Sequence, residues 1–283
     1  MISFVKRAAL DVEKYDSCIE NSIQSRIYAF SWYLDIVADH WDVLVLNDYE
    51  AVMPLPWKKK FGLKYITQPY FCQQLGIFSK EEISEEIQRQ FIRKIPLKFL
   101  KVSLALNSHN LLIGQQIKKN LSVKLNKNYE SICKNYSKGR KHAIKVAEKN
   151  QLMVAETSIQ SLIDIQKKFY QYEFSEEKLQ KLSIQLLHQQ KGAILGIFKD
   201  EVLLGGALFV FSTKRIVYLF SAFTELGREL QVASFLLNFM LTKNENSQLI
   251  FDFEGGNILN MGKFYRSFGA EEEIYALVTR TLV

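Results

Sequence analysis

LIFDFEGGNILNMGKFYRSFGA, residues 249–270, gathers two carboxylates, a glycine pair and an aromatic pair near the end of the chain. The apolar run over 249–254 predicts a strand, and apolar residues at helical spacing over 258–267 predict a helix. A closing strand is predicted over 273–282, EIYALVTRTL, because this segment is rich in β-branched and aromatic residues. The stretch therefore predicts a strand–helix–strand unit with its acids and glycines at the first turn.

The rest of the second half predicts the order β-α-α-β-β-β-α ahead of this unit. Three apolar runs, parted by KDE and STK, predict antiparallel strands joined by hairpins. The expected elements are a strand at 152–158, helices at 159–172 and 175–190, strands at 193–198, 202–211 and 215–223, and a helix at 229–242.

The first half can be read in the same order, which predicts a duplication. Its expected elements are a strand at 4–10, helices at 11–21 and 30–40, strands at 42–47, 50–57 and 63–68, a helix at 81–93, a strand at 97–106, a helix at 109–119 and a strand at 121–126. The predicted fold class is a mixed α/β protein with tandem domains at 1–127 and 151–283, joined by a basic helix over 128–150.

The joining segment, NYESICKNYSKGRKHAIKVAEKN, predicts one amphipathic helix at about 100° per residue. Its apolar arc holds Ile132, Cys133, Tyr136, Gly139, Ala143, Ile144 and Ala147, and the opposite side holds Lys134, Lys138, Lys141 and Lys145. Arg140 projects into the apolar arc, where an unpaired guanidinium is costly to bury. We expect Arg140 to contact an anionic ligand, a fan of carbonyls or a salt-bridge partner at a domain interface. Lys138 and Lys141 are candidates for the same ligand, although such a stripe is also typical of a solvated face.

The composition is that of a globular protein with a full core: 283 residues, 48% hydrophobic and 24% charged. A net charge of +7 favours anionic partners such as phosphates, acidic sugars or RNA, but a basic solvated surface explains it equally. The three cysteines, Cys18, Cys72 and Cys133, have no metal or disulfide spacing. Neither a signal peptide nor an apolar run of about 18 residues is present, so we expect a cytoplasmic protein without a membrane-spanning segment or metal.

The element order, with FYRSFGA in its last helix, resembles the Gcn5-related N-acetyltransferase (GNAT) superfamily. Two such domains, the basic segment YSKGRKHAIKVAEK and the motif FDFEGG are together similar to the Fem family. Members of that family add amino acids to peptidoglycan precursors from aminoacyl-tRNA. The resemblance covers essentially the whole chain, and its motifs are short and aromatic-rich.

Two departures from these patterns bear on the donor. Fem-type enzymes usually carry Phe-Lys where this chain has Phe264 followed by Tyr265, and Tyr265 with Gly269 matches the superfamily pattern Tyr-x-x-x-Gly. The superfamily tyrosine acts as general acid, which favours a thioester donor such as acetyl-CoA. The superfamily's coenzyme A loop, (Gln/Arg)-x-x-Gly-x-(Gly/Ala), aligns with Arg228 to Ala233 but has Gln231 at the first glycine. That change weakens a phosphate site made of backbone N–H groups.

The resemblance implies further site residues. Backbone N–H groups from Ser221, Ala222 and Phe223 would bind the acyl carbonyl. If the neighbouring phenylalanines are core residues, Asp252 and Glu254 face outward or into a cleft, since alternate strand residues share a face. Glu254 is the better candidate for taking the ammonium proton; alternatively, one carboxylate caps the helix from Asn257 or pairs with Arg266. Tyr265 is alternatively a core tyrosine, and Gln73 and Gln74 fit either substrate recognition or hairpin packing.

The leading hypothesis is an N-acyltransferase that moves an acyl group, with acyl-CoA as the favoured donor, to an amine of a small-molecule or cell-envelope acceptor. A Fem-like aminoacyl-tRNA-dependent transferase acting on peptidoglycan precursors is the alternative. A third reading is a non-catalytic member of the fold that binds an anion or RNA through the lysine face. No RNA-binding aromatic motif accompanies that face.

Overall fold

The computed structural model describes residues 1–110, 115–170 and 173–282. They form two compact units: unit 1 is Met1–Lys118 with Ile274–Val283, and unit 2 is Lys119–Glu273. Each unit is a mixed sheet covered by helices, as the sequence predicts for tandem GNAT-like domains.

Unit 1 carries strands in the order β1-β2-β3-β4-β6-β13, with β5 beside β3. All neighbours are antiparallel except β4 and β6, which run parallel. Its elements are β1 (Ile2–Lys6), α1 (Val12–Asn21), α2 (Ser31–Val37), β2 (His40–Leu46), β3 (Ala51–Lys60), β4 (Leu63–Thr67), β5 (Phe78–Ser79), α3 (Glu85–Arg93) and β6 (Phe99–Ala105), with 3-10 turns at Arg7–Ala9 and Ile27–Ala29.

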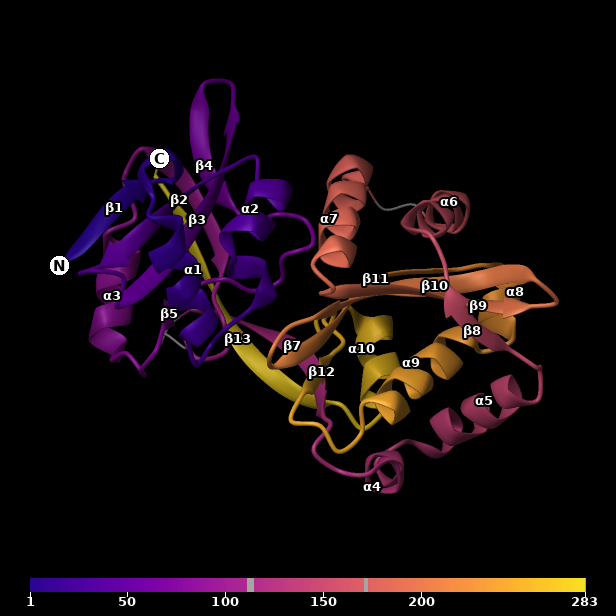
Figure 1. The fold of residues 1–283 in the computed structure, drawn as a ribbon. Helices are drawn as coiled ribbons and strands as arrows, with labels where there is room; N and C mark the ends of the chain where they lie inside the picture. The colour runs from indigo at the N-terminus through magenta and orange to yellow at the C-terminus, as the bar shows by residue number, and fades with distance from the viewer. Residues whose placement is uncertain (111–114, 171–172, 283) are drawn as a thin grey trace. The chain divides into compact units, whose positions relative to one another are not determined.

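Unit 2 carries strands in the order β7-β12-β11-β10-β9-β8, and only β11 and β12 run parallel. In Figure 1, α6 and α7 cover one face of this sheet, and α9 and α10 cover the other. Its elements are β7 (Gln116–Lys124), α4 (Tyr129–Lys134), α5 (Lys138–Glu148), β8 (Met153–Glu156), α6 (Ile159–Phe169), α7 (Glu176–His188), β9 (Gly192–Lys199), β10 (Val202–Phe211), β11 (Arg215–Phe223), α8 (Glu225–Glu229), α9 (Val232–Lys243), β12 (Ile250–Asp252) and α10 (Leu259–Arg266).

The two halves of the sequence exchange their last strands. The strand that ends the first half, β7, pairs with β12 of unit 2. The strand that ends the second half, β13 (Glu271–Thr281), pairs with β6 of unit 1 through Lys101–Ala105. The units therefore differ from the predicted division: the basic segment 128–150 lies inside unit 2, and residues 274–283 belong to unit 1.

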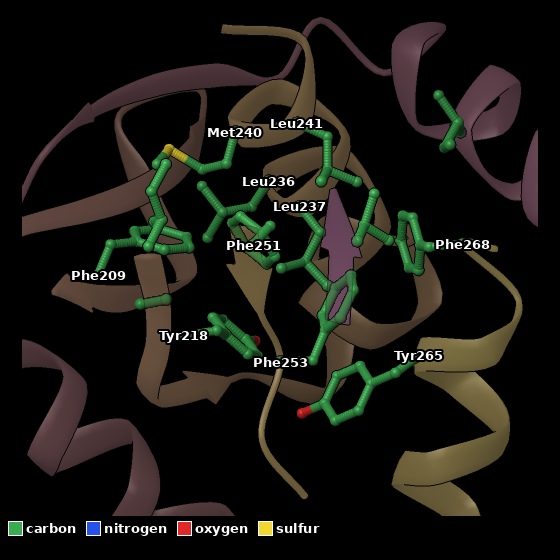
Figure 2. Close-up of a cluster of buried hydrophobic side chains, with 14 of the residues drawn as sticks. Phe209, Tyr218, Leu236, Leu237, Met240, Leu241, Phe251, Phe253, Tyr265 and Phe268 are labelled. Carbon is green, nitrogen blue, oxygen red and sulfur yellow. The ribbon is translucent and has the colours of Figure 1, made fainter. Parts of the chain in front are cut away.

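Aromatic side chains from β10, from β12 and from the residues that follow β12 and α10 form the centre of the unit 2 core (Figure 2). Phe209, Phe251, Phe253 and Phe268 are each at most 1% exposed. Fully burying a side chain of this kind contributes about 1.5–3 kcal/mol relative to leaving it exposed. The helix α9, VASFLLNFMLTK, is apolar almost all round because it lies between the sheet and α5. This core holds β12 and α10, which carry the opening motif.

Most predicted elements are present, and their caps agree with the sequence. The meander over β9, β10 and β11 is antiparallel as expected, and Ser175 caps α7 by accepting from the Lys178 N–H. The single helix over 128–150 is wrong. It is broken before Ser137, whose hydroxyl accepts from the Arg140 N–H at 3.1 Å and starts α5.

The predicted helix over 109–119 is also wrong in its described part. Residues 107–110 form a turn, residues 116–119 begin β7, and residues 111–114 lie outside the described chain. The strand forms because β7 pairs with β12, whose residues lie more than 120 positions further along the chain. A long-range pairing of this kind overrides local helical spacing. The predicted strand over 4–10 is also only partly correct, because β1 spans Ile2–Lys6 and a 3-10 turn follows it.

Candidate active site

Strands β11 and β12 pair for three residues and then diverge. Their parallel register runs from Arg215 opposite Ile250 to Val217 opposite Asp252, whereas β11 continues to Phe223. Beyond Val217 no described strand pairs with this side of β11. The backbone there is the expected place for an acyl carbonyl to bind.

At most one of the three predicted N–H donors is left for a ligand. Ser221 and Ala222 both pair with β10 and lie beyond the divergence, and only one of these two successive N–H groups can point away from β10. The Phe223 N–H donates to the Tyr170 hydroxyl at 3.2 Å, and that hydroxyl lies 3.3 Å from the Phe223 carbonyl. Tyr170 was not foreseen from the sequence, and the Arg228 guanidinium lies 5.4 Å from the centre of its ring. One N–H group, that of Ser221 or Ala222, therefore remains the candidate carbonyl donor.

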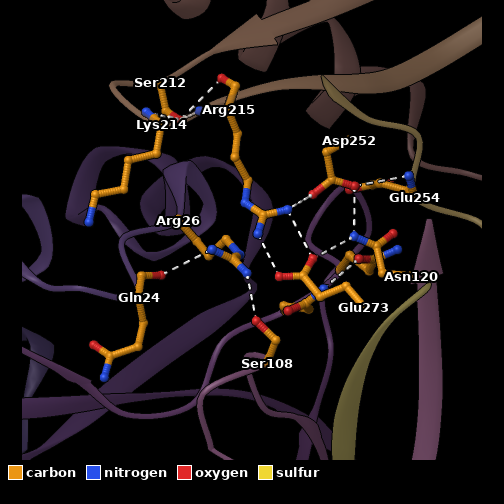
Figure 3. Close-up of polar contacts among 12 residues, drawn as sticks. Gln24, Arg26, Ser108, Asn120, Ser212, Lys214, Arg215, Asp252, Glu254 and Glu273 are labelled. Carbon is orange, nitrogen blue, oxygen red and sulfur yellow. Dashed lines mark hydrogen bonds and ion pairs between the residues drawn. The ribbon is translucent and has the colours of Figure 1, made fainter. Parts of the chain in front are cut away.

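A buried ion-pair network fixes the end of β12 (Figure 3). Asp252 is 1% exposed and accepts from Arg215 at 2.8 Å. The same guanidinium donates to both carboxylate oxygens of Glu273, at 2.9 and 2.5 Å. Asn120 donates to Asp252 at 2.8 Å and to Glu273 at 3.1 Å. The expectation that Asp252 faces outward or into a cleft is therefore wrong, because its carboxylate is buried against these partners.

The charge of this network is stable because its members compensate one another. Burial acts to lower the pKa of Arg215, but the charges of Asp252 and Glu273 outweigh burial and raise that pKa overall. The guanidinium is therefore charged at any physiological pH. Asp252 therefore holds the end of β12 through its ion pair with Arg215.

Glu254 lies just past the strand, in a left-handed backbone conformation with φ of 56°. Its N–H donates to the Asp252 carboxylate at 3.1 Å, and its side chain is half-buried. Left-handed backbone at a residue other than glycine is strained and is found preferentially at functional positions. Glu254 thus remains the candidate proton acceptor, and Asp252 fixes its backbone.

The glycine elbow after Glu254 is clamped to β7. A Cβ atom on Gly256 would lie 2.6 Å from the Lys119 carbonyl oxygen, so only glycine allows this approach. The Asn257 side chain donates to the same carbonyl at 2.9 Å and accepts from the Lys119 N–H at 3.0 Å. The elbow therefore has a defined position relative to the sheet of unit 2.

Tyr265, on α10, is 3% exposed at the edge of the core cluster in Figure 2. Its ring stacks on Phe253 with centroids 4.9 Å apart, and Tyr218 meets it edge-on at 6.2 Å. Tyr218 is the first β11 residue beyond the last β12 pair. The tyrosine is thus both a core residue and a neighbour of the strand divergence, so both readings of its role remain.

Arg140 is buried inside unit 2, as the helical arc predicts. Its Nε donates to the Ser267 hydroxyl at 2.9 Å, and Nη1 donates to the Ser234 hydroxyl. The guanidinium also lies over the rings of Phe264 and Phe268, at 4.1 and 4.6 Å. No described carboxylate pairs with it, and burial lowers its pKa to about 10. The predicted salt bridge of Arg140 at a domain interface is therefore wrong. Among the described residues, the positive charge of Arg140 has no carboxylate partner, and it lies beside Ser234 in the first turn of α9.

We expect Arg140→Lys to lower the free energy of unfolding by about 1–3 kcal/mol, because lysine loses the hydrogen bond to Ser267 and the planar stacking on Phe264 and Phe268. Chemical denaturation measures the change. Lys145→Arg, an exchange of the same two residue types at an exposed position of α5, is the matched control and should change stability by less than about 0.5 kcal/mol. Equal stability of Arg140→Lys and the parent protein would mean that these contacts contribute nothing.

The residue before α9, Gln231, stands where the superfamily motif has its first glycine. Gln231 has a φ of 60°, the left-handed conformation that the motif's glycine would adopt readily. No described side chain caps α9. Uncapped N–H groups at a helix start and the charge of Arg140 together favour an anion.

The remaining candidate site residues lie on α5 and in unit 1. Lys138 is exposed on α5 and Lys141 is half-buried beside the Lys134 carbonyl. Gln74 is 1% exposed and donates to Gln73 at 2.9 Å, both within unit 1. Hydrogen bonding between the two amides agrees with ordinary packing of the first half.

Sequence reasoning missed Arg215, Glu273 and Asn120. A weak signal existed, since an arginine opens the otherwise apolar run RIVYLFSAF. The residues near Arg215 in the sequence do not indicate its partners. Asp252 is brought to Arg215 by the pairing of β11 with β12, and Glu273 belongs to β13.

No protein-family model matches this chain, and no curated protein is similar to it in sequence. Its fold is similar to that of FemX, with a TM-score of 0.70 at 9% identity over 94% of this chain and 95% of that chain. It is also similar to a tandem GNAT protein from the clavulanic acid biosynthesis pathway, with a TM-score of 0.54 at 10% identity over 100% and 99% of the two chains.

A third similar structure is L-PGS from Bacillus licheniformis, with a TM-score of 0.54 at 12% identity over 96% of this chain and 92% of that chain. The chain therefore has a fold similar to that of FemX and of a tandem GNAT protein over essentially its whole length. Among the described residues, no helix has the length and apolar character needed to cross a bilayer.

Proposed function

We propose that the protein is an N-acyltransferase that moves an acyl group from acyl-CoA to an amine of a small-molecule or cell-envelope acceptor. The observation that carries this proposal is the divergence of β11 from β12 after Val217, with Tyr265 packed against the next residue, Tyr218. Open strand backbone supplies an N–H group to a developing oxyanion, which is worth about 2.7–4 kcal/mol when well placed. Tyr265 supplies a proton at the same place.

Three steps follow for the residues of unit 2. Glu254 takes the proton of the acceptor ammonium, directly or through water, and Asp252 holds the Glu254 backbone while it does so. The N–H group of Ser221 or Ala222 that points away from β10 stabilises the tetrahedral oxyanion. Tyr265 protonates the departing thiolate and recovers a proton from the attached nitrogen, so the amine becomes an amide and the thiol leaves neutral.

The donor would bind at the start of α9. The uncapped N–H groups there and the charge of Arg140 favour phosphate oxygens, and the left-handed backbone at Gln231 brings the helix start close to them. Arg228, exposed at the end of α8, would add a second positive charge.

An aminoacyl-tRNA-dependent transferase acting on peptidoglycan precursors is the second candidate. It is favoured by the likeness to FemX, which extends over 94% of this chain. Both candidates place the reaction in unit 2 and differ in the donor.

Thermal unfolding of the full chain with acetyl-CoA, longer acyl-CoAs or aminoacyl-tRNA separates the two. A ligand that binds only the folded protein stabilises it by about 2.7 kcal/mol at 100 times its dissociation constant. We expect this stabilisation with a thioester. Ala233→Glu places a carboxylate in the first turn of α9, which stabilises the helix by about 0.3–1 kcal/mol but repels the donor phosphates. Its stability and its donor affinity should therefore change in opposite directions.

Gln160→Glu, at the second residue of α6, is the matched control, since it adds the same charge to another helix start. It should leave the response to the donor unchanged. If aminoacyl-tRNA stabilises the protein and no thioester does, the donor is aminoacyl-tRNA and the acyl-CoA proposal is wrong. If a thioester stabilises Ala233→Glu as much as the parent protein, the donor does not bind at the start of α9.

A further inference from the structure

The β3–β4 hairpin of unit 1 projects beyond its neighbouring strands (Figure 1). Pairing of β3 with β2 ends at Trp57 opposite His40, and pairing of β4 with β6 starts at Lys64. Within the described chain, residues 58–63 therefore have no strand beside them except each other. We refer to residues 58–64 as the hairpin tip.

The turn at the hairpin tip holds a phenylalanine in a position that suits asparagine or glycine. Lys60 pairs with Leu63, so Phe61 and Gly62 form a two-residue turn, with φ of 51° and 80°. Positive φ at both central residues defines a type I′ turn, where Asn-Gly is strongly preferred. A bulky residue there carries backbone strain.

The same phenylalanine gains no burial from folding. Phe61 is 91% exposed and Leu63 is 56% exposed, and with Leu100 they line a surface hollow of about 470 Å³. Strain and apolar exposure at one residue both work against the folded monomer. Their combination at a projecting tip indicates a surface kept for a partner.

Positive charge surrounds this apolar surface. Lysines occur on both strands of the hairpin tip and on neighbouring β6: Lys58, Lys59, Lys60, Lys64 and Lys101. Lys58 lies 3.5 Å from Asp39, and the other lysines form no ion pair among the described residues. The described residues that line the hollow include no acid. The partner therefore combines negative charge with an apolar phase.

We propose that the hairpin tip docks on an anionic lipid bilayer. Phe61 and Leu63 enter the boundary between headgroups and acyl chains, and the lysines contact the lipid phosphates while their stems cover apolar surface. RNA fits less well, because the aliphatic side chains of Leu63 and Leu100 cannot stack on bases as aromatic rings do. A second copy fits less well, because lysine would face lysine. The inference goes beyond the proposed acyl transfer and does not depend on it.

Sedimentation of the full chain with vesicles tests this docking. We expect binding to phosphatidylcholine vesicles that contain phosphatidylglycerol, weakening with salt, and none to phosphatidylcholine alone. Phe61→Asn should lower vesicle affinity roughly tenfold or more, while the unfolding temperature holds or rises because Asn-Gly suits the turn. The pair Lys59→Gln and Lys60→Gln should lower affinity by roughly 25-fold at low salt, about fivefold per lysine.

Two matched variants make the same kinds of change elsewhere. Ile184→Gln removes an apolar side chain that is 67% exposed on α7, and Lys145→Gln with Lys149→Gln removes two exposed charges at the end of α5. Both should bind vesicles like the parent protein. The proposal is overturned by equal binding to both vesicle types, by unchanged binding of Phe61→Asn, or by a loss confined to the α5 variant.

Two further results would assign the tip to another partner and overturn the lipid proposal. One is binding of an RNA hairpin at physiological salt that Phe61→Asn abolishes, without vesicle binding. The other is concentration-dependent dimerisation of the parent protein that the same substitution abolishes.

Discussion

Arg215→Met lowers the free energy of unfolding of this protein by about 3–5 kcal/mol, because it leaves two carboxylates without their counter-charge in a buried setting. Asp252 and Glu273 contact the guanidinium at 2.8 and 2.5 Å, with side chains only 2% and 18% exposed. Methionine retains much of the arginine stem, so the loss reports mainly on charge. Urea denaturation of the full chain measures it.

Arg266→Met is the matched control. Arg266 pairs with Glu272 at 2.8 Å, but both side chains are well exposed, at 41% and 37%. An exposed pair contributes about 0–1 kcal/mol, so this variant should differ little from the parent. Combining Arg215→Met with Asp252→Asn and Glu273→Gln should recover part of the loss, since no uncompensated charge then remains. If Arg215→Met and Arg266→Met lower the free energy of unfolding equally, burial does not make the Arg215 ion pairs more important for stability.

Tyr265→Phe lowers turnover with a thioester donor by roughly two orders of magnitude or more, with donor affinity little changed. The substitution keeps the ring that stacks on Phe253 and removes only the proton donor. The lost hydroxyl should lower stability by about 1 kcal/mol. Steady-state kinetics and thermal unfolding of the same preparation measure both effects.

Tyr136→Phe makes the same chemical change in the same core. Tyr136 is 4% exposed, and its hydroxyl donates to Asn238 at 3.2 Å. This control should lose a similar amount of stability and keep full turnover. Full activity of Tyr265→Phe would remove Tyr265 from the mechanism, and failure of that variant to fold would make it a core tyrosine only. With aminoacyl-tRNA as the donor, the substitution should matter less.

Local patterns predicted much of the fold. The hairpins around β10 follow from apolar runs parted by charged turns, and the start of α7 follows from Ser175 and the acids after it. The break in 128–150 was missed, although Ser137 is a typical helix cap, because helical spacing of apolar residues continues across it. Helical spacing alone does not distinguish one helix from two in line.

Candidate residues were predicted well where a helix or short motif determined them. Arg140 is buried because helical geometry rotates it into the apolar arc, whatever lies opposite. Asp252 was placed on the correct strand, but its burial was not foreseen, since its partner Arg215 lies 37 positions earlier in the chain. Partners that meet only through strand pairing leave no signal at short spacing.

The sequence by itself determined most of the order of elements, the strand–helix–strand motif of residues 249–282 and the inward direction of Arg140, because propensity, periodicity and capping act over a few neighbouring residues. Only the tertiary structure decided that β7 joins the sheet of unit 2 and β13 that of unit 1. It also decided that Asp252 and Glu273 share one arginine. Both outcomes depend on which distant backbone groups satisfy each other's hydrogen bonds, and a strand's own residues do not specify that partner.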